Sequence, residues 1–492
     1  MATLATQVPP EWIAAPKRML FGGEWVEAAS GETLVSIDPS DGSTLAEVPS
    51  GGPADVDAAV ACARAAFEAP SWAHMTPDAR SVVLWRLADL VEAHAEELAL
   101  LDTLDGGKPL ATARRIDLPF TARLLRYWAG WPARIEGASV RLSLPIAHHA
   151  FTSREPLGVV GVIAPWNAPS MFVAWKAAAA LACGNTVVFK PAEETSLSAL
   201  RIAELALEAG LPPGALNVVT GFGERAGAAL AAHPDVDKVA FTGSVETGRS
   251  VVAGALGNLK RVSLELGGKS ANVVCADADL DAAIAGAAHA IFFNQGCVCA
   301  AGARLYVQEP VYEAVLEGVV RAAEAIRVGP ARDLGTRMGP LISGAQRERV
   351  AGLVSAALDG GARALTGARA ADGAGFFYEP TVLVDAAGAR VAREEVFGPV
   401  LVVERFGDLD EAIALANDSD YGLAAGIWSR DVAVAHRFAQ AARAGTVWVN
   451  AFHLVDAALP FGGFGQSGWG RDLGREAIDL YTETKAVCMR LG

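Results

Sequence analysis

GVVGVIAPWNAPSMFVAWKAAAALACGNTVVFK, residues 158–190, places an Ala-rich helical run (172–183) between two short β-rich runs (158–164 and 185–190). The alternation continues with a helix over 196–209, a strand over 217–220, a helix over 224–232 and a strand over 238–244. Strands joined by helices of this length form a doubly wound parallel sheet, which binds ligands at the carboxyl ends of its strands. The stretch therefore predicts an α/β fold with a ligand site at that edge.

The pattern extends in both directions along the chain. Helices are expected over 54–67 and around 84–91, and a second α/β unit is expected to begin near residue 262 with the strand VSLELGG (262–268). A helix over 282–289 and strands over 304–308, 399–406 and 445–450 continue this unit. Residues 134–152 read as a projecting hairpin. The last twenty residues read as a helix and a final strand, whose partner could be the hairpin of another subunit.

Composition excludes several classes of protein. A chain of 492 residues with 52% hydrophobic residues favours two or three domains with large cores. The net charge of −15 disfavours nucleic acid and anionic lipid as partners. No uncharged apolar stretch reaches membrane-spanning length, residues 1–20 show no signal peptide, and six cysteines are too few for a disulfide scaffold. We expect a soluble, cytoplasmic protein.

Two strand-to-helix turns are candidate phosphate sites. Gly221-Phe222-Gly223-Glu224 follows one strand and FTGSVETG (241–248) follows another, so free backbone N–H groups could face an anion. Each could equally be a tight turn with a Ser/Thr cap. Lys190 and Glu193, at the end of the strand over 185–190, suit ribose hydroxyls or form a solvated ion pair.

Two cysteines, a carboxylate and an amide are further candidates for carrying chemistry. Cys297 and Cys299 lie in FFNQGCVCAAG (292–302), which reads as a loop opening a helix, where a thiol pKa would be lowered; either cysteine could instead be a small buried residue. Glu265 ends a strand in a glycine turn, or simply pairs with Lys269. Asn167 is an amide donor at another strand end, or forms an Asx turn. The cysteines do not have zinc-site spacing, so no metal is expected.

Together these motifs resemble the NAD(P)-dependent aldehyde dehydrogenase superfamily, in the family's order and over about residues 20–490. The motifs are Pro165-Trp166-Asn167, Lys190-Pro191-Ala192-Glu193, FTGSVETG (241–248), Glu265-Leu266-Gly267-Gly268-Lys269, the loop 292–302, Glu394-Glu395-Val396-Phe397-Gly398-Pro399 and Pro460-Phe461-Gly462-Gly463. The resemblance implies a Rossmann-type NAD-binding domain (1–133 and 153–264), an α/β catalytic domain (265–465) and a small β oligomerisation element (134–152 and 466–492). Homodimers or homotetramers are implied.

The resemblance also implies roles for the catalytic residues. The nucleophile would be Cys299, which precedes Gly302-Ala303-Arg304 by three residues and lies 299 − 265 = 34 positions after Glu265. Asn167 and the backbone N–H of Cys299 would form the oxyanion hole, and Glu265 would activate the water that hydrolyses a thioester. Relatives often carry Gln where this chain has Cys297, and two nearby thiols invite oxidation.

The cofactor is implied to be NAD rather than NADP, because Glu193 would repel a 2′-phosphate. Lys190 and Glu193 would hold the adenosine ribose, and Glu395 and Phe397 the nicotinamide ribose. Trp166 and Ser244 would lie near the pyrophosphate. The remaining implied cofactor residues are Gly223, Gly227, Phe241, Gly243 and Leu266.

The implied substrate channel is apolar, with no evident arginine to hold a carboxylate, so a hydrophobic aldehyde, aromatic or medium-chain, is expected. The channel residues are Phe172, Trp175, Cys297, Val298, Val455 and Phe461. His453 and Asp456 could add polar selectivity or merely shape their loop. Alternatives are a semialdehyde or coenzyme A-acylating dehydrogenase, a catalytically idle protein that kept the fold, and a cofactor-free thiol hydrolase. The last has no sequence-evident His partner.

Overall fold

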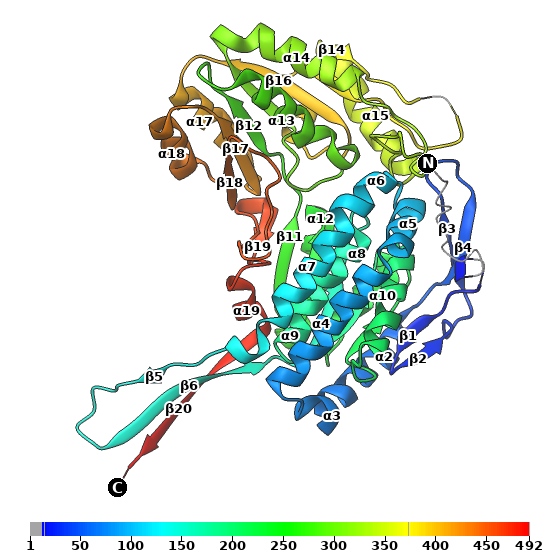
Figure 1. Ribbon diagram of the computed structural model, residues 1–492, viewed down its shortest axis with the longest axis vertical. Coiled ribbons are helices and arrows are strands. Elements are labelled where there is room, and N and C mark those ends of the chain that lie inside the picture. Colours follow the sequence, from blue (N-terminus) through cyan, green and yellow to red (C-terminus); the bar gives the residue numbers. More distant parts are fainter. Residues whose placement is uncertain (1–11, 14, 372, 492) are drawn as a thin grey trace.

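The computed structural model describes residues 12–13, 15–371 and 373–491. Two large sheets with their helices lie one above the other, and a narrow arm that carries the C-terminus leaves the lower one (Figure 1). The stretch 1–20, where the sequence indicates no signal peptide, falls partly outside the described residues. None of the helices in the described part of the chain combines the length and hydrophobicity that a transmembrane span requires.

The first sheet contains eight strands: β1 (Met19–Phe21), β2 (Glu24–Val26), β7 (Val159–Ile163), β8 (Thr186–Lys190), β9 (Leu216–Val218), β10 (Lys238–Gly243), β11 (Arg261–Leu266) and β19 (Gly468–Trp469). Their order is β19-β11-β10-β7-β8-β9-β1-β2. The five central strands, from β11 to β9, are parallel, and the outer ones are antiparallel to their neighbours. The predicted doubly wound parallel sheet is confirmed.

Helices cover both faces of this sheet. They include α2 (Pro53–Glu68), α4 (Pro77–Ala93), α5 (Ala95–Gly106), α7 (Leu118–Ala129), α9 (Ala178–Ala182), α10 (Leu197–Glu208), α11 (Ala228–Ala232) and α12 (Val245–Gly254). Successive strand residues point to opposite faces. Val160 and Val162 of β7 accordingly pack in the core with α4, α7 and α10, whereas Val159 and Ile163 pack in a second core with α2, α11 and α12.

The predicted helix over 172–183 is present but contains a π-helical turn between two α-helical segments. It runs as α8 (Pro169–Phe172), a π-helical turn η3 (Val173–Ala177) and α9. The predicted helix over 224–232 likewise begins with a π-helical turn, η4 (Gly223–Gly227), before α11. π-Helical turns often occur at functional sites, and both of these lie at the carboxyl edge of the first sheet.

The second sheet contains seven strands: β12 (Ala271–Val274), β13 (Arg304–Gln308), β14 (Arg363–Thr366), β15 (Thr381–Val384), β16 (Val400–Phe406), β17 (Ala424–Trp428) and β18 (Thr446–Val449). Its order is β14-β15-β16-β13-β12-β17-β18, and only β14 is antiparallel to its neighbour. Its helices include α13 (Leu280–Phe292), α14 (Tyr312–Glu324), α15 (Gly344–Asp359), α17 (Leu409–Asn417) and α18 (Val432–Ala441).

One expectation about this second unit is wrong. The strand predicted over 262–268 to open it is β11, which pairs in parallel register with β10 of the first sheet. The chain enters the second sheet only at β12. Both strands follow the same local pattern, and only the register with β10 determines which sheet receives β11.

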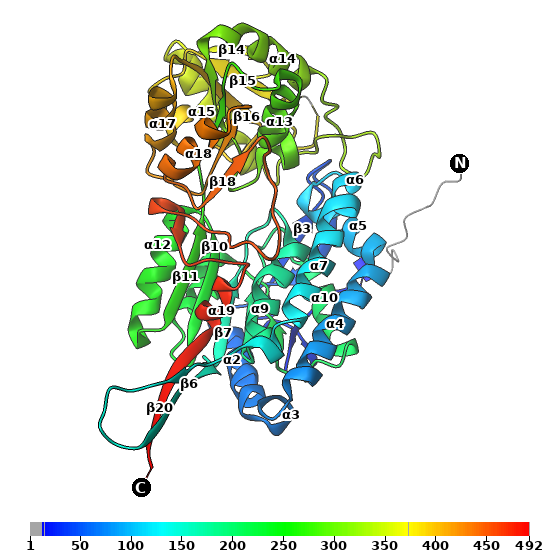
Figure 2. The ribbon, with the colours of Figure 1, turned by 60° about the vertical axis from the view of Figure 1, so that its left-hand side comes forward.

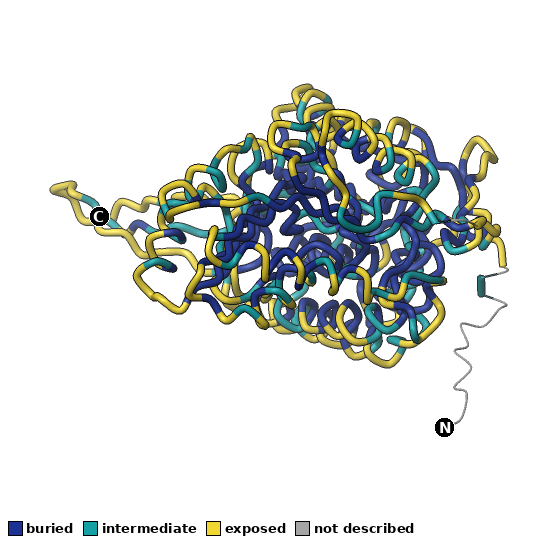
Figure 3. The backbone as a smooth tube through the Cα atoms, turned by 90° about the horizontal axis from the view of Figure 1, so that it is seen from above, coloured by how far each residue is buried: buried dark blue, intermediate teal, exposed yellow. Residues whose placement is uncertain are grey.

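The arm is a three-stranded sheet that extends away from the body (Figures 1 and 2). It consists of β5 (Ser139–Val140), β6 (His148–Pro156) and the final strand β20 (Thr482–Arg490), which follows α19 (Glu476–Tyr481). The projecting hairpin is therefore confirmed. The suggestion that β20 pairs with another subunit's hairpin is wrong, because β20 pairs antiparallel with β6 of its own chain from Thr482↔Pro156 to Arg490↔His148. In Figure 3 the arm, which is mostly exposed or half-buried, projects from a body whose interior is largely buried.

Candidate active site

Polar residues gather at the carboxyl edge of the first sheet. Strand register brings Ile163 beside both Lys190 and Phe241, and it brings Thr242 beside Glu265 and Gly243 beside Leu266. The chain continues from β7 into Trp166 and Asn167. The edge predicted from sequence to bind a ligand therefore assembles segments from four consecutive parallel strands.

Two cavities meet at this edge. The larger, of about 420 Å³, lies between the end of the first sheet and the residues around Glu395. The smaller, of about 300 Å³, lies against α7, η3 and the loop that contains His453. Both are lined by Asn167, Phe172, Thr242, Glu265 and Cys299. The structure thus brings the three predicted catalytic residues to the junction of the two spaces.

The segment before Cys299 has an unusual backbone. After α13 comes a 3₁₀ turn (Phe293–Gly296) in which Asn294, Gln295 and Gly296 have φ of 49°, 57° and 72°. Left-handed backbone at non-glycine residues costs about 1–3 kcal/mol each and persists only where the surroundings impose it. A Cβ at Gly296 would overlap the carbonyl of Gly398, so only glycine fits there.

Side-chain amides impose this conformation. Asn294 Nδ2 donates to the carbonyls of Asn167 and Cys297, each at 3.2 Å. Gln295 Nε2 donates to the carbonyls of Gly107 at 2.9 Å and Pro340 at 3.0 Å. Three of these hydrogen bonds tie the cysteine loop to three other segments, the fourth lies within the loop, and together they fix the position of Cys299.

Cys299 does not lie at a helix N-terminus, so that expectation is corrected. It lies in a turn that leads directly into β13. Burial, together with the nearby carboxylates of Glu395 and Glu265, raises the pKa of the Cys299 thiol to about 12. The predicted lowering of its pKa is wrong, because the helix dipole that would have lowered it is not there.

Asn167 is oriented for donation into the junction. Its Nδ2 donates one hydrogen to the carbonyl of Cys297 at 2.9 Å. An amide nitrogen carries two hydrogens, so one remains for a ligand. The backbone N–H of Cys299 faces its own sulfur, and it donates to no carbonyl among the hydrogen bonds between loops and turns of the described residues. Two donors are therefore available near the thiol.

Glu265 is a buried carboxyl group with a raised pKa. It is 5% exposed, and its Oε2 has no hydrogen-bond partner in the described part of the chain. Burial and the neighbouring Asp472 raise its pKa well above the ordinary value, while Lys176, which lies 2.5 Å from Asp472, opposes the shift. A Cβ at Gly462 would lie 2.7 Å from Glu265 Oε1, so glycine there allows the loop to approach.

Six of the predicted cofactor residues line the larger cavity: Trp166, Gly243, Ser244, Leu266, Glu395 and Phe397. The rings of Trp166 and Phe397 meet edge to face, with centroids 5.2 Å apart. Glu395 Oε1 accepts from the N–H of Gly268 at 3.2 Å, and burial raises the Glu395 pKa to about 7. Ser244 also caps α12 by accepting from the N–H of Thr247, as the simpler interpretation predicted.

The other predicted cofactor residues lie along the same edge but outside this cavity lining. Lys190 is buried and donates to Glu193 at 3.2 Å, so the ion pair is present. Gly227 lies against the Lys190 side chain, Gly223 faces open space, and Phe241 is buried beneath Gly243.

Gln346 and Arg349 of α15 also line the larger cavity, although the sequence did not single them out. Gln346 donates to the carbonyl of Phe397 at 2.8 Å, and Arg349 to that of Glu395 at 2.8 Å. Glu246 and Tyr421 complete the unpredicted polar lining. No motif in the sequence marks the α15 residues, because only tertiary packing brings α15 to this cavity.

The smaller cavity has the expected apolar lining, with two corrections. Phe172, Trp175, Val298, Val455 and Phe461 line it. Cys297 does not: it is 2% exposed and its Sγ donates to the carbonyl of Phe397 at 3.4 Å, inside a separate core. Further lining that was not predicted includes Phe120, Met171, Phe293 and Trp448.

An arginine does border the smaller cavity, contrary to the expectation. Arg123 of α7 is exposed and lies over the ring of Phe120, with 5.4 Å between the guanidinium carbon and the ring centroid. It comes from a helix far from the sequence motifs. Apart from Glu265, the other lining residues with Asp, Glu or Lys side chains, which are Lys108, Asp117 and Asp472, are buried in ion pairs. Asp456 shapes its own turn by accepting from the N–H of Ala458.

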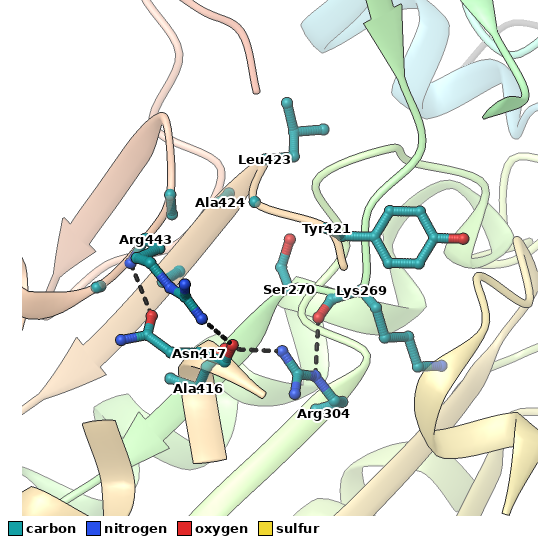
Figure 4. Close-up of a pocket in the computed structure, with 13 residues that line it drawn as sticks. Lys269, Ser270, Arg304, Ala416, Asn417, Tyr421, Leu423, Ala424 and Arg443 are labelled. Carbon is teal, nitrogen blue, oxygen red and sulfur yellow. Dashed lines mark hydrogen bonds between the residues drawn. The ribbon is translucent and has the colours of Figure 1, made fainter. Parts of the chain in front are cut away.

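A small cavity of about 10 Å³ behind the site is structural rather than catalytic (Figure 4). There Arg304 donates to the carbonyl of Lys269 at 2.8 Å and to carbonyls at the end of α17, such as that of Ala416 at 3.0 Å. Arg304 therefore anchors the glycine turn after Glu265 to the second sheet. No cluster of three or more potential metal ligands occurs within the described residues.

Comparisons with known proteins agree with this geometry. The family model described as "Aldehyde dehydrogenase family" matches residues 25–487. Phenylacetaldehyde dehydrogenase of Pseudomonas fluorescens is 48% identical over 99% of this chain and 98% of that protein. Mitochondrial benzaldehyde dehydrogenase of Antirrhinum majus is 44% identical over 100% of this chain and 92% of that protein. The NAD⁺ complex of an aldehyde dehydrogenase from Bacillus cereus superposes with a TM-score of 0.96, at 44% identity and over 98% of each chain.

Proposed function

Because this chain belongs to the aldehyde dehydrogenase family, we propose that it oxidises hydrophobic aldehydes, aromatic ones above all, to the free acids. The chain is an NAD-dependent aldehyde dehydrogenase of α/β fold. One observation carries the proposal: Cys299, Glu265 and Asn167 line the junction between an apolar cavity and a polar one. The printed names of two relatives, phenylacetaldehyde and benzaldehyde dehydrogenase, support an aromatic substrate.

The larger cavity fits a dinucleotide. The glycine turn that lines this cavity lies directly against the Glu395 side chain, because a Cβ at Gly267 would overlap the Glu395 carboxylate. Glu395 would accept from ribose hydroxyls, Ser244 and Trp166 would lie near the pyrophosphate, and Lys190 with Glu193 would hold the adenosine ribose. The remaining proposed contacts are Gly223, Gly227, Phe241, Gly243, Leu266 and Phe397. A dinucleotide held there would supply the acceptor for the hydride that leaves the substrate carbon.

The chain's own residues perform the remaining chemistry. Cys299 Sγ bonds to the aldehyde carbon as the thiol releases its proton to water, and the carbonyl oxygen becomes an oxyanion. Asn167 and the N–H of Cys299 donate to that oxyanion. After hydride loss, a thioester joins the acyl group to Cys299. Glu265 takes a proton from water, which attacks the thioester; the C–S bond breaks and the acid leaves.

Glu265 favours hydrolysis over transfer of the acyl group to coenzyme A. A buried carboxyl with a raised pKa suits a general base for water, and a coenzyme A-acylating enzyme has no need of one. Arg123 at the smaller cavity favours one alternative, a semialdehyde substrate whose carboxylate pairs with the guanidinium. The relative kcat/KM for hydrophobic and for carboxylate-bearing aldehydes decides between these two substrate classes.

With NAD and no coenzyme A, NADH formation at 340 nm is expected to be fastest with benzaldehyde, phenylacetaldehyde or a medium-chain aliphatic aldehyde. The apolar lining around Phe172, Trp175 and Phe461 gains free energy by burying such groups. A higher kcat/KM with carboxylate-bearing aldehydes would contradict the hydrophobic class and favour the semialdehyde alternative. A requirement for coenzyme A would contradict hydrolysis.

Replacing Glu193 with Gln is expected to reduce the preference for NAD over NADP by about tenfold, the change that ~1.4 kcal/mol of lost repulsion produces. The half-buried carboxylate lies 3.2 Å from Lys190 and would repel a 2′-phosphate. The ratio of kcat/KM for the two cofactors measures this effect. Glu194→Gln is the matched control and should leave the ratio unchanged. A wild-type preference for NADP would refute the assignment.

The domain assignment is also part of the proposal. We assign residues 1–133 and 153–264 to NAD binding, 265–465 to catalysis, and 134–152 with 466–492 to a homo-oligomer contact, either dimeric or tetrameric. The exposed edge of β20 supports the last assignment, because an unpaired strand edge invites another strand. Six unpaired cysteines support a reducing compartment such as the cytoplasm.

A further inference from the structure

His453 occupies a distinctive place in the wall of the smaller cavity. Four aromatic rings surround its imidazole, with centroid separations from 5.1 to 5.9 Å, and they belong to His289, Phe293, Trp448 and Phe452. The mechanism assigns no task to this imidazole. It is a polar group in an otherwise aromatic corner of the substrate space.

The polar atoms of His453 lack partners. Nδ1 and Nε2 are both buried, and although the backbone of Ala300 lies close enough to affect the pKa of the ring, neither nitrogen has a partner within hydrogen-bond geometry in the described part of the chain. Buried polar atoms normally have hydrogen-bond partners, so each exception calls for an explanation. Both nitrogens are shielded from the cavity in this conformation, but the ring itself lines the cavity, so a rotation of the imidazole would present one nitrogen to a ligand there.

The backbone holds this ring in place at a cost. His453 has φ of 59°, a left-handed conformation that is uncommon outside glycine. The next residue is held by the Trp448 indole, which donates to the carbonyl of Leu454 at 2.8 Å. Strained residues maintained by their surroundings are concentrated at ligand sites.

The imidazole is neutral at physiological pH. Burial lowers the pKa of His453 to about 3, and the nearby His289 acts in the same direction, while the backbone of Ala300 opposes them. A neutral imidazole has one N–H donor and one acceptor nitrogen. Its best partner is a group that can both donate and accept without carrying charge.

We propose that His453 recognises a hydroxyl group on the ring of an aromatic aldehyde, making ring-hydroxylated aldehydes the preferred substrates. A phenolic hydroxyl donates and accepts, and the surrounding rings accommodate the arene. A carboxylate suits this corner less well, because it only accepts and would bring a charge among apolar rings. The inference rests on the proposed function, since it requires aromatic aldehydes to be substrates.

The test compares kcat/KM for 2-, 3- and 4-hydroxybenzaldehyde with that for benzaldehyde, in wild type and His453→Phe. We expect at least one hydroxylated isomer to be preferred in wild type. The variant should reduce that ratio by about 3- to 10-fold, the size of one neutral hydrogen bond. A ratio taken on one protein preparation is independent of the fraction folded. His453→Asn, which tolerates left-handed backbone and keeps a donor and an acceptor, should retain part of the preference.

The matched control is His289→Phe. His289 borders the same cavity but is exposed, so its nitrogens can reach solvent. This variant should leave the hydroxyl preference unchanged, and an equal loss would overturn the assignment to His453. Benzaldehyde turnover with no preference for any hydroxylated isomer would overturn the inference and leave the proposed function intact. Failure to oxidise any aromatic aldehyde would overturn the proposed function itself.

Discussion

Cys299→Ala is expected to lower dehydrogenase activity by about 10⁴-fold or more, because no thiohemiacetal or thioester can form without the nucleophile. The side chain lies at the junction of the two cavities, so its loss removes the bond-forming atom while the cavity walls remain. NADH formation under saturating NAD and benzaldehyde measures the effect. Binding of NAD, followed by quenching of tryptophan fluorescence, should be retained and shows that the variant is folded.

Cys297→Ala is the matched control and is expected to retain much of the activity. Cys297 is two residues away in the same loop, but its Sγ points to the carbonyl of Phe397 rather than into either cavity. Its loss removes one weak hydrogen bond and a small amount of packing. Comparable losses in both variants would contradict the assignment of Cys299, and a larger loss in Cys297→Ala would reverse it.

The polar residues at strand ends are the part of the site that the sequence predicts best. Asn167, Lys190, Gly243 and Glu265 each follow or end a short β-rich run, and parallel strands place such ends along one edge. Local pattern therefore predicted both the sheet and the edge that binds ligands. It could not assign β11 to a sheet, since two adjacent α/β units present the same alternation.

Side-chain environment depends on contacts between distant segments, which local pattern does not contain. The sequence of the loop 292–302 resembles a helix start. In the structure, however, hydrogen bonds from the side-chain amides of Asn294 and Gln295 hold the loop in a left-handed turn. Cys299 lies beyond this turn, and burial together with the nearby carboxylates of Glu395 and Glu265 raises the pKa of its thiol instead of lowering it. The sequence pattern does not indicate Arg123 either, because only tertiary packing brings α7 to the smaller cavity.

The raised pKa of Glu265 gives its expected role a defined pH dependence. A general base acts only when it is deprotonated, so thioester hydrolysis should accelerate as pH rises through the pKa of this carboxyl. Burial and Asp472 place that pKa well above the ordinary value of 4.5, so the inflection should lie well above that of a solvated glutamate. Deacylation of a preformed acyl-enzyme, followed across pH, isolates this step.

Glu265→Gln should therefore separate the two halves of the reaction. Acylation needs Cys299 and the oxyanion donors, so the first turnover should proceed and release about one NADH per active site as a burst. Hydrolysis should then slow by about 10²–10⁴-fold, the usual contribution of a general base, and lose its pH dependence. Mass spectrometry of the stalled enzyme should find the acyl group on Cys299.

An added nucleophile distinguishes a lost base from a damaged site. Added after excess aldehyde has been removed, hydroxylamine attacks the thioester without needing Glu265, so it should release the acyl group of Glu265→Gln as a hydroxamate and free Cys299, whereas wild type holds little acyl-enzyme to release. Release of the hydroxamate would mean that the thioester accumulates and that only water activation is missing. Full steady-state turnover without a burst would instead remove Glu265 from this role. It would then leave the buried Oε2 of Glu265, which has no hydrogen-bond partner among the described residues, without a catalytic explanation.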